Sequence, residues 1–336
     1  MTELPVHLSF PVRPDQGVVI SWIQSDFGPG RGVRFRPVGA ADSAWRFAPA
    51  ETRPQPHAGW LHRAWLDDLP PDTPVEYQVI PGPGTANLRI RRTRTAPAGD
   101  RAAFRFAFFA DTGLIGRLDG NANGTAAVYA ALASAEPLFL LGGGDYAYAN
   151  KDGRFASIPA AIDEWFRQAA PLLERFPLYA QYGNHECILK EHVEDWSGRF
   201  THPPGFDGDR SYSFAIGGVH FSMLFMPDID SFLPSHARWL DEDLAKARRA
   251  GAVRLVVVQH EPIYGHGRSH PARPIIRETL VPILERHRVD LHLSAHDQNY
   301  ERTYPLTHRA ENGGRVPVVG SQDRCQYPDW TGVVYA

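Results

Sequence analysis

The chain has 336 residues, of which 43% are hydrophobic and 22% are charged. This composition is typical of a globular protein with a packed core and excludes disorder as a global state. The formal net charge of −3, from 38 acidic and 35 basic residues, gives no global attraction to nucleic acid or to an anionic membrane.

The length and the cysteine content limit the architecture further. Domains usually hold about 100 to 200 residues, so we expect one large domain and one small one. The two cysteines, Cys187 and Cys325, exclude a dense disulfide framework and leave room for one bridge. Residues 1–5 lack the basic and apolar regions of an export signal, and no run of about 18 apolar residues occurs. We therefore expect a soluble, cytoplasmic protein, with a secreted mature form as the alternative; the sequence gives no indication of the oligomeric state.

The first part of the chain has the pattern of an all-β unit. Short apolar runs are separated by Gly and Pro from Val6 to about Thr95, as in a small β-sandwich. The clearest of these runs are residues 18–23, 33–35, 60–66 and 75–79. The Pro-rich segment 69–74 resembles the corner of a fibronectin type III domain. With a Pro-Gly boundary at residues 97–100, we expect a fibronectin type III-like sandwich in residues 1–99.

The second part, residues 100–336, has the pattern of an α/β domain. Fully apolar short runs alternate with longer helical stretches, which is typical of buried strands and their crossover helices. We expect strands over 104–110, 138–141 and 255–258, and helices over 125–135, 158–175, 235–250 and 275–287. We also expect a β-hairpin formed by 212–216 and 219–224, joined through Gly217-Gly218, and a final strand within 331–336.

Five small polar clusters each follow an apolar run, where ligands gather in α/β sheets. The carboxylate, amide and imidazole groups in these clusters suit iron, zinc or manganese, and a loop carboxylate can bridge two ions. The clusters are Asp111-Thr112-Gly113, Gly144-Asp145-Tyr146-Ala147-Tyr148, Gly183-Asn184-His185-Glu186, Gln259-His260 and Ala295-His296-Asp297-Gln298.

In this order the clusters resemble the D-x-G, G-D-x-x-Y, G-N-H-E, x-x-H and G-H-x-H motifs of purple acid phosphatases, within the calcineurin-like metallophosphoesterases. The resemblance covers nearly the whole chain, including the segment 59–64 of the predicted sandwich. It implies a metallophosphoesterase domain with a four-layer αββα sandwich in residues 100–336. It also implies a centre of two metal ions, iron together with zinc, manganese or a second iron.

The resemblance assigns roles to eight residues. It implies that Asp111 and Tyr148 hold the first metal and that Asp145 bridges the two ions. It assigns the second metal to Asn184, His260 and His296. His185 matches the family histidine that faces the leaving group or the phosphoryl oxygens, and His270 matches the other histidine, which is proposed as a proton donor. Both are candidates for protonating the leaving group.

One departure from the family pattern concerns the first metal directly. Gln298 stands where the family has a metal-binding histidine, and Ala295 replaces the preceding glycine. An amide oxygen is a poorer donor than imidazole for a first-row transition metal, so the first site should be weaker or select another ion. Asp297 is a conceivable substitute, although its loop could direct the side chain elsewhere. Residues 225–230 also depart from the family, so the pocket above the metals should differ.

The function that follows is hydrolysis of a phosphorylated small molecule, with a phosphomonoester favoured by the resemblance. Two cations a few ångströms apart can generate hydroxide near neutral pH and stabilise an in-line displacement by that metal-bound hydroxide. A histidine that protonates the leaving alkoxide contributes roughly 10²- to 10⁴-fold. Two alternatives stay open: altered chemistry, such as cleavage of a phosphodiester or phosphoamide or a pathway-specific substrate, and a non-catalytic relative that only binds.

Overall fold

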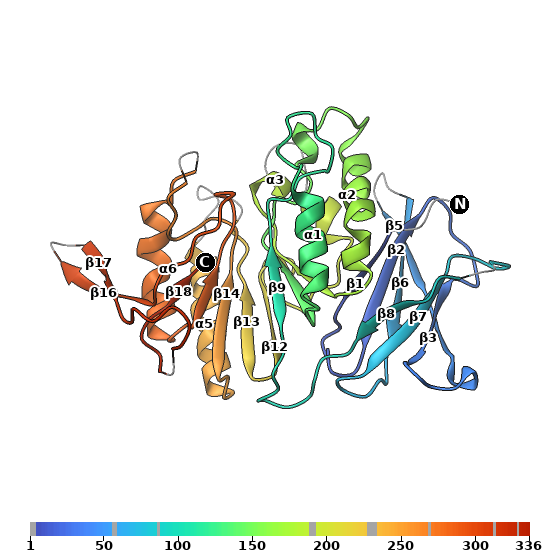
Figure 1. Ribbon diagram of the computed structural model, residues 1–336, viewed down its shortest axis with the longest axis horizontal. Coiled ribbons are helices and arrows are strands. Elements are labelled where there is room, and N and C mark those ends of the chain that lie inside the picture. Colours follow the sequence, from blue (N-terminus) through green and yellow to red (C-terminus); the bar gives the residue numbers. More distant parts are fainter. Residues whose placement is uncertain are drawn as a thin grey trace.

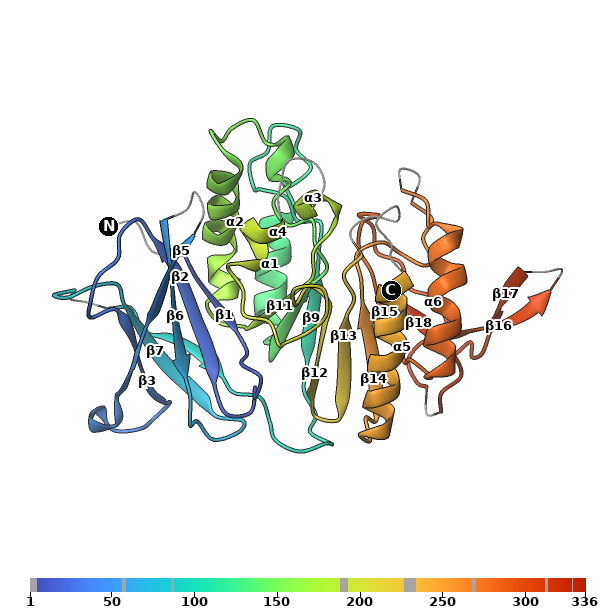
Figure 2. The same ribbon diagram turned by 180° about the vertical axis from the view of Figure 1, so that it is seen from behind.

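The computed structural model describes residues 5–55, 59–85, 88–187, 193–226, 234–267, 270–311, 314–327 and 329–336. The N-terminal strands lie at one end of the molecule, and two further sheets with their helices fill the middle (Figures 1 and 2). A β-hairpin projects at the opposite end. Within the described ranges, none of the helices has the length and apolar character that a membrane span requires.

The N-terminal unit consists of two four-stranded antiparallel sheets, which confirms the predicted β-sandwich. Side chains from both sheets, including Trp22 and Phe35, share one hydrophobic core. The likeness to fibronectin type III domains stays a prediction. The first sheet has the order β1 (Val6–Ser9), β2 (Val18–Gln24), β6 (Gly59–Leu66), β5 (Glu51–Gln55). The second has the order β4 (Arg46–Pro49), β3 (Gly32–Pro37), β7 (Pro74–Ile80), β8 (Arg91–Arg94).

The remainder of the chain contains a three-stranded sheet, a five-stranded sheet and a separate hairpin. The first is parallel, in the order β11 (Leu178–Ala180), β10 (Phe139–Gly142), β9 (Phe106–Phe109). The second is mixed, in the order β12 (Tyr212–Ile216), β13 (Val219–Met223), β14 (Arg254–Val258), β15 (Leu291–Leu293), β18 (Val334–Tyr335). The predicted hairpin is β12–β13, and the predicted final strand is the edge strand β18. The projecting hairpin pairs β16 (Leu306–Glu311) with β17 (Gly314–Val319).

Aromatic side chains hold the parallel sheet and the mixed sheet against each other. The ring of Tyr179 stacks on Phe214 with centroids 3.5 Å apart, and Phe139 meets Phe221 edge-on at 5.5 Å. Tyr179 and Phe139 come from the parallel sheet, whereas Phe214 and Phe221 come from the mixed sheet. Such ring pairs add about 0.5 to 1.5 kcal/mol beyond the area that they bury. The inner faces of the two sheets therefore form one continuous core.

Helices cover the outer faces and complete four layers. The helices α1 (Thr125–Ser134) and α2 (Ile158–Leu173) belong to the core of the parallel sheet, and α5 (Pro234–Arg249) and α6 (Pro274–Arg286) belong to that of the mixed sheet. All four predicted helices are therefore confirmed, with ends that differ by one or two residues. Short turns near the strand ends are η2 (Ala149–Lys151), α3 (Asn184–Cys187) and α4 (Val193–Ser197), and η1 (Asp42–Ala44) lies in the sandwich.

A buried carboxylate joins the sandwich to the domain that follows. Glu174, at the end of α2, accepts hydrogen bonds from Arg89 at 2.5 Å and from Arg91 at 2.8 Å. The backbone oxygen of Glu174 also accepts one from the Tyr77 hydroxyl at 2.6 Å. Hydrogen bonds to charged groups contribute more than neutral ones, about 1.5 to 3 kcal/mol each. The two cysteines do not form the bridge for which the sequence left room, because both thiols are free.

Candidate metal centre

Side chains from five loops meet at one edge of the parallel and mixed sheets. Each loop follows one of the parallel strands β9, β10, β11, β14 and β15, whose carboxyl ends lie on the same side. Several of the predicted site residues have a left-handed backbone conformation, which is strained for residues other than glycine. These are Asp111, Asp145, Tyr148, His296 and Gln298, with φ of 51°, 54°, 50°, 72° and 55°. Such strain concentrates at functional sites because the surrounding structure must hold it in place.

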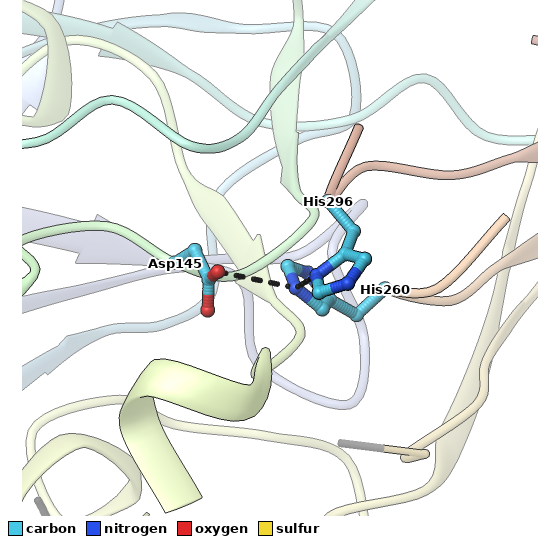
Figure 3. A group of neighbouring side chains, drawn as sticks. All are labelled: Asp145, His260 and His296. Atoms are coloured by element: carbon cyan, nitrogen blue, oxygen red, sulfur yellow. Dashed lines mark hydrogen bonds and ion pairs between the residues drawn. The ribbon is translucent and has the colours of Figure 1, made fainter. Parts of the chain in front are cut away.

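Three candidate ligands of the second metal converge on a nitrogen of the fourth, His260. His260 Nε2 lies 3.1 Å from Asn184 Oδ1, 3.1 Å from His296 Nδ1 and 3.3 Å from Asp145 Oδ2. Figure 3 shows the Asp145 carboxylate and the two imidazoles directed at one another. Single atoms of Asp145, His260 and His296 all lie within 4.8 Å of one another, close enough to hold one metal ion. Carboxylate, amide and imidazole donors suit iron, zinc or manganese.

The His260 ring is held with a defined nitrogen toward this group. Its Nδ1 lies 2.8 Å from the Gly143 carbonyl oxygen, which can only accept, so Nδ1 carries the proton. Metal-binding histidines usually have such a partner because it fixes the tautomer. Gly183 makes the close packing possible: a Cβ there would lie 2.5 Å from His260 Cε1 and nearer still to Asp145 Oδ1.

The candidate ligands of the first metal form a second, adjoining group. The Tyr148 hydroxyl donates to Asp111 Oδ1 at 2.9 Å and accepts from Gln298 Nε2 at 2.9 Å. Asp111 Oδ2 accepts from the backbone N–H of His296 at 2.9 Å, which links the two groups. Gln298 thus lies beside Tyr148, another candidate ligand of the first metal. Rotation of its amide would present the oxygen in place of the nitrogen.

Asp297 lies on the other side of this turn. Its carboxylate accepts a hydrogen bond from the Gly267 backbone N–H at 3.3 Å, and it packs closely against Gly265 and Gly267. Asp297 therefore belongs to the contacts of the 265–267 loop, and it does not replace the missing histidine as a ligand.

The charges of the site favour a cation among its carboxylates. Burial raises the pKa of Asp111 to about 6, and the Asp145 carboxylate adds to that rise. Burial by itself lowers the pKa of His260, but the charges of Asp145 and Asp111 raise it to about 10. Burial lowers the pKa of His296 to about 3, so that imidazole is neutral, as a metal ligand must be. A metal ion among these residues would supply the positive charge that the carboxylates attract.

Both histidines predicted to act on the substrate lie beside the two groups. The His185 ring packs against the Tyr148 ring with centroids 4.3 Å apart, and its Nδ1 lies 2.8 Å from Asn150 Oδ1. The exposed His270 packs its ring against His296 at 4.4 Å. The structure therefore brings together all nine residues that the sequence singled out.

A buried carboxylate to which the sequence analysis gave no role holds two of the loops together. Glu186 is fully buried and accepts three backbone hydrogen bonds. The donors are the N–H groups of Asp145, Tyr146 and Gly183, at 2.7, 2.9 and 2.8 Å. Glu186 lies next to His185 in the sequence, but adjacency alone does not distinguish a ligand from a group that fixes the backbone.

The comparisons with known proteins agree with this arrangement. A family profile described as calcineurin-like phosphoesterase matches residues 104–300. The chain is 26% identical over 350 residues to purple acid phosphatase 23 of Arabidopsis thaliana, covering 90% of this chain and 75% of the relative. It is 28% identical over 352 residues to an uncharacterized protein of Mycobacterium tuberculosis, covering 93% of this chain and 64% of that protein.

A solved structure shows the same fold. The purple acid phosphatase from yellow lupin (Lupinus luteus) seeds superposes with a TM-score of 0.77 and 16% identity. The match covers 98% of this chain and 63% of the lupin chain. The similarity therefore includes the sandwich as well as the domain with the candidate centre, although the lupin protein is longer.

Replacement of Glu186 tests its role in holding the two loops. In the wild-type protein, backbone N–H groups donate to both carboxylate oxygens of Glu186. In Glu186→Gln, an NH₂ group replaces one of these oxygens, so that two donors face each other. We expect zinc or manganese affinity to fall by roughly 10- to 100-fold, as for other groups that orient metal ligands. We also expect a lower melting temperature of the metal-free protein, because buried N–H groups lose their acceptor.

Metal titration calorimetry and thermal denaturation measure the two effects. Glu194→Gln is the matched control, since the Glu194 side chain is 66% exposed in an ion pair with Arg210. Equal metal affinity and equal melting temperature in Glu186→Gln and Glu194→Gln would show that Glu186 does not hold the loops.

Proposed function

The chain belongs to the calcineurin-like phosphoesterase family, and we propose that it hydrolyses phosphate esters, preferably monoesters, at a centre of two metal ions. The observation that carries this proposal is the convergence of Asn184, His296 and Asp145 on His260 Nε2 within 3.3 Å. The monoester preference is supported by the relatives named purple acid phosphatase. Iron with zinc, manganese or a second iron suits the donor set.

The proposed ligand sets follow the two groups of contacts. Asn184, His260 and His296 would hold one ion, and Asp145 would be shared between the two. The other ion would be held by Asp111, Tyr148 and Gln298. When bound, the two ions supply Lewis-acid activation of the phosphoryl group and of the attacking water.

His185 is the proposed donor of a proton to the leaving group. Asn150 holds its Nδ1, and no residue in the described parts of the chain hydrogen-bonds to its Nε2. That nitrogen is therefore available to a substrate. Burial lowers the pKa of His185 to about 4, and the positive charges of Lys151 and Arg117 act in the same direction, so the imidazolium that donates the proton is the main form only in acidic solution. His270 is more exposed, and we propose that it contacts the phosphoryl oxygens.

We propose that residues 100–336 form the catalytic domain and residues 1–99 an accessory, fibronectin type III-like sandwich. All nine candidate site residues lie in the second segment, between Asp111 and Gln298. The family profile begins at residue 104. The contacts of the buried Glu174 carboxylate with Arg89 and Arg91 hold the accessory unit in place.

A second candidate function is binding without catalysis, and Gln298 is the observation that favours it. An amide at this position weakens the first site, and one ion alone would not clamp both the attacking and leaving oxygens. Cleavage of diesters is a variant of the catalytic proposal. Rates with p-nitrophenyl phosphate and bis(p-nitrophenyl) phosphate separate monoesterase, diesterase and non-catalytic protein.

Replacement of His296 tests the metal-centred reaction. We expect protein reconstituted with iron, zinc or manganese to hydrolyse p-nitrophenyl phosphate. Replacing a group that orients a metal ligand typically lowers activity by up to roughly 100-fold. His296→Ala should lower the hydrolysis rate by more than this, because it removes a ligand itself. His266→Ala is the control, since that side chain is 96% exposed and should be replaceable without loss. Equal activity of the two variants would refute a reaction at this centre.

The leaving group identifies the proton donor. A good leaving group such as p-nitrophenolate needs little protonation, whereas an alkoxide needs it strongly. We expect His185→Ala to lose roughly 10²- to 10⁴-fold in kcat with an alkyl phosphate and much less with p-nitrophenyl phosphate. His270→Ala should lower both rates by similar factors. The reverse pattern in the two variants would assign the proton to His270 and contradict the role of His185.

A further inference from the structure

A basic pocket adjoins the candidate metal centre. It has a volume of about 370 Å³ and is lined by side chains that include Arg117, Asp119, Lys151, Asp152 and Arg154. Pockets for small molecules usually measure about 300 to 1,000 Å³, so this one has room for part of a substrate. We refer to it as the Lys151 pocket.

The charges in the Lys151 pocket do not cancel. Arg117 pairs with Asp119 at 2.5 Å, and Arg154 pairs with Asp152 at 2.6 Å. Lys151 has no carboxylate within 4 Å among the residues that the structure describes, and its side chain is exposed. Each acid of the pocket is thus matched by an arginine, and the ammonium group of Lys151 is the surplus charge.

The surplus charge lies against a candidate ligand of the first metal. Lys151 Nζ is 6.0 Å from the centroid of the Tyr148 ring, and Arg117 Cζ is 5.2 Å from it. The His185 ring packs against the same tyrosine at 4.3 Å. Two pocket cations and the proposed proton donor therefore lie around the same aromatic ring.

The backbone fixes this arrangement. Lys151 is the last residue of η2, the short turn that follows Tyr148 directly. The preceding residue, Asn150, holds His185 Nδ1 at 2.8 Å. One turn of chain thus carries a candidate metal ligand, the partner of the proposed proton donor and the unpaired lysine. If the leaving oxygen of a substrate approaches His185, the rest of the leaving group would therefore lie near the Lys151 pocket.

We propose that the Lys151 pocket binds a second anionic group of the substrate, so that the enzyme prefers organic phosphates that carry another phosphate or a carboxylate. Lys151 is then a specificity-determining residue. A lysine suits this task because its compact charge lies on a flexible stem and can follow an anion over several positions. This assignment depends on the proposed hydrolysis of phosphate esters and adds to it a class of substrate.

A matched pair of substrates tests the assignment. The probes are the monophosphates and bisphosphates of 1,3-propanediol and 1,6-hexanediol, which vary the distance between the anions. We expect the wild-type protein to show a higher kcat/KM for a bisphosphate than for its monophosphate, beyond the statistical advantage of two equivalent ends. This preference should decrease as salt is raised, because an exposed charge pair is screened.

Lys151→Gln should lower the ratio of the two kcat/KM values by roughly three- to tenfold, the range expected for one charge-assisted contact at an exposed site. Lys246→Gln is the matched control, since it removes the same charge from the last turn of α5. It should leave the ratio as in the wild-type protein.

Three outcomes would overturn the assignment. An unchanged ratio in Lys151→Gln would exclude the lysine as the anion site. Hydrolysis of monophosphates with no preference for bisphosphates would exclude the pocket while the proposed function stands. Absence of hydrolysis with all four probes in the reconstituted protein would refute the proposed function, and the pocket assignment with it.

Discussion

The hydrogen bonds from three backbone N–H groups to the buried Glu186 carboxylate are the constraint on which the candidate centre depends. They join the loop after β10 to the loop after β11, and thereby bring Asp145 next to Asn184. Asp145 in turn accepts from the His185 backbone at 2.9 Å. A buried carboxylate costs free energy unless its oxygens are fully used, and these contacts meet that condition. These hydrogen bonds therefore help to position the candidate ligands Asp145 and Asn184.

The rest of the fold supplies the rigid base for these loops. Parallel strands end at one edge, and the aromatic pairs between the sheets fix the distance from the β9–β11 side to the β14–β15 side. His260 and Asp145 come from opposite sheets, so their 3.3 Å contact requires both sheets to stay in register. Small residues allow this closeness, since a side chain at Gly183 would displace both ligands.

Much of the fold and of the centre could be predicted from the sequence, because both leave local patterns. Apolar runs and helical periodicity identified β10, β14, α2 and α5, and the order of five short motifs indicated which loops meet. Contacts between distant residues left no such pattern. Nothing local shows that Glu186 accepts from residue 145, or that Asp297 turns toward Gly267. The surplus of charge at Lys151 was likewise hidden, because it depends on which arginines pair with which acids in space.

The number of metal ions per chain in the wild-type protein and in Gln298→His tests the two-metal centre most directly. Both proteins would be loaded with excess iron and zinc, dialysed stepwise and analysed for metal. We expect two ions per chain at saturation in both proteins. One ion should leave the wild-type protein at an earlier dialysis step than it leaves Gln298→His, because an amide holds the ion less firmly than an imidazole. Saturation at one ion or none in both proteins, or identical loss during dialysis, would contradict a centre of two ions completed by Gln298.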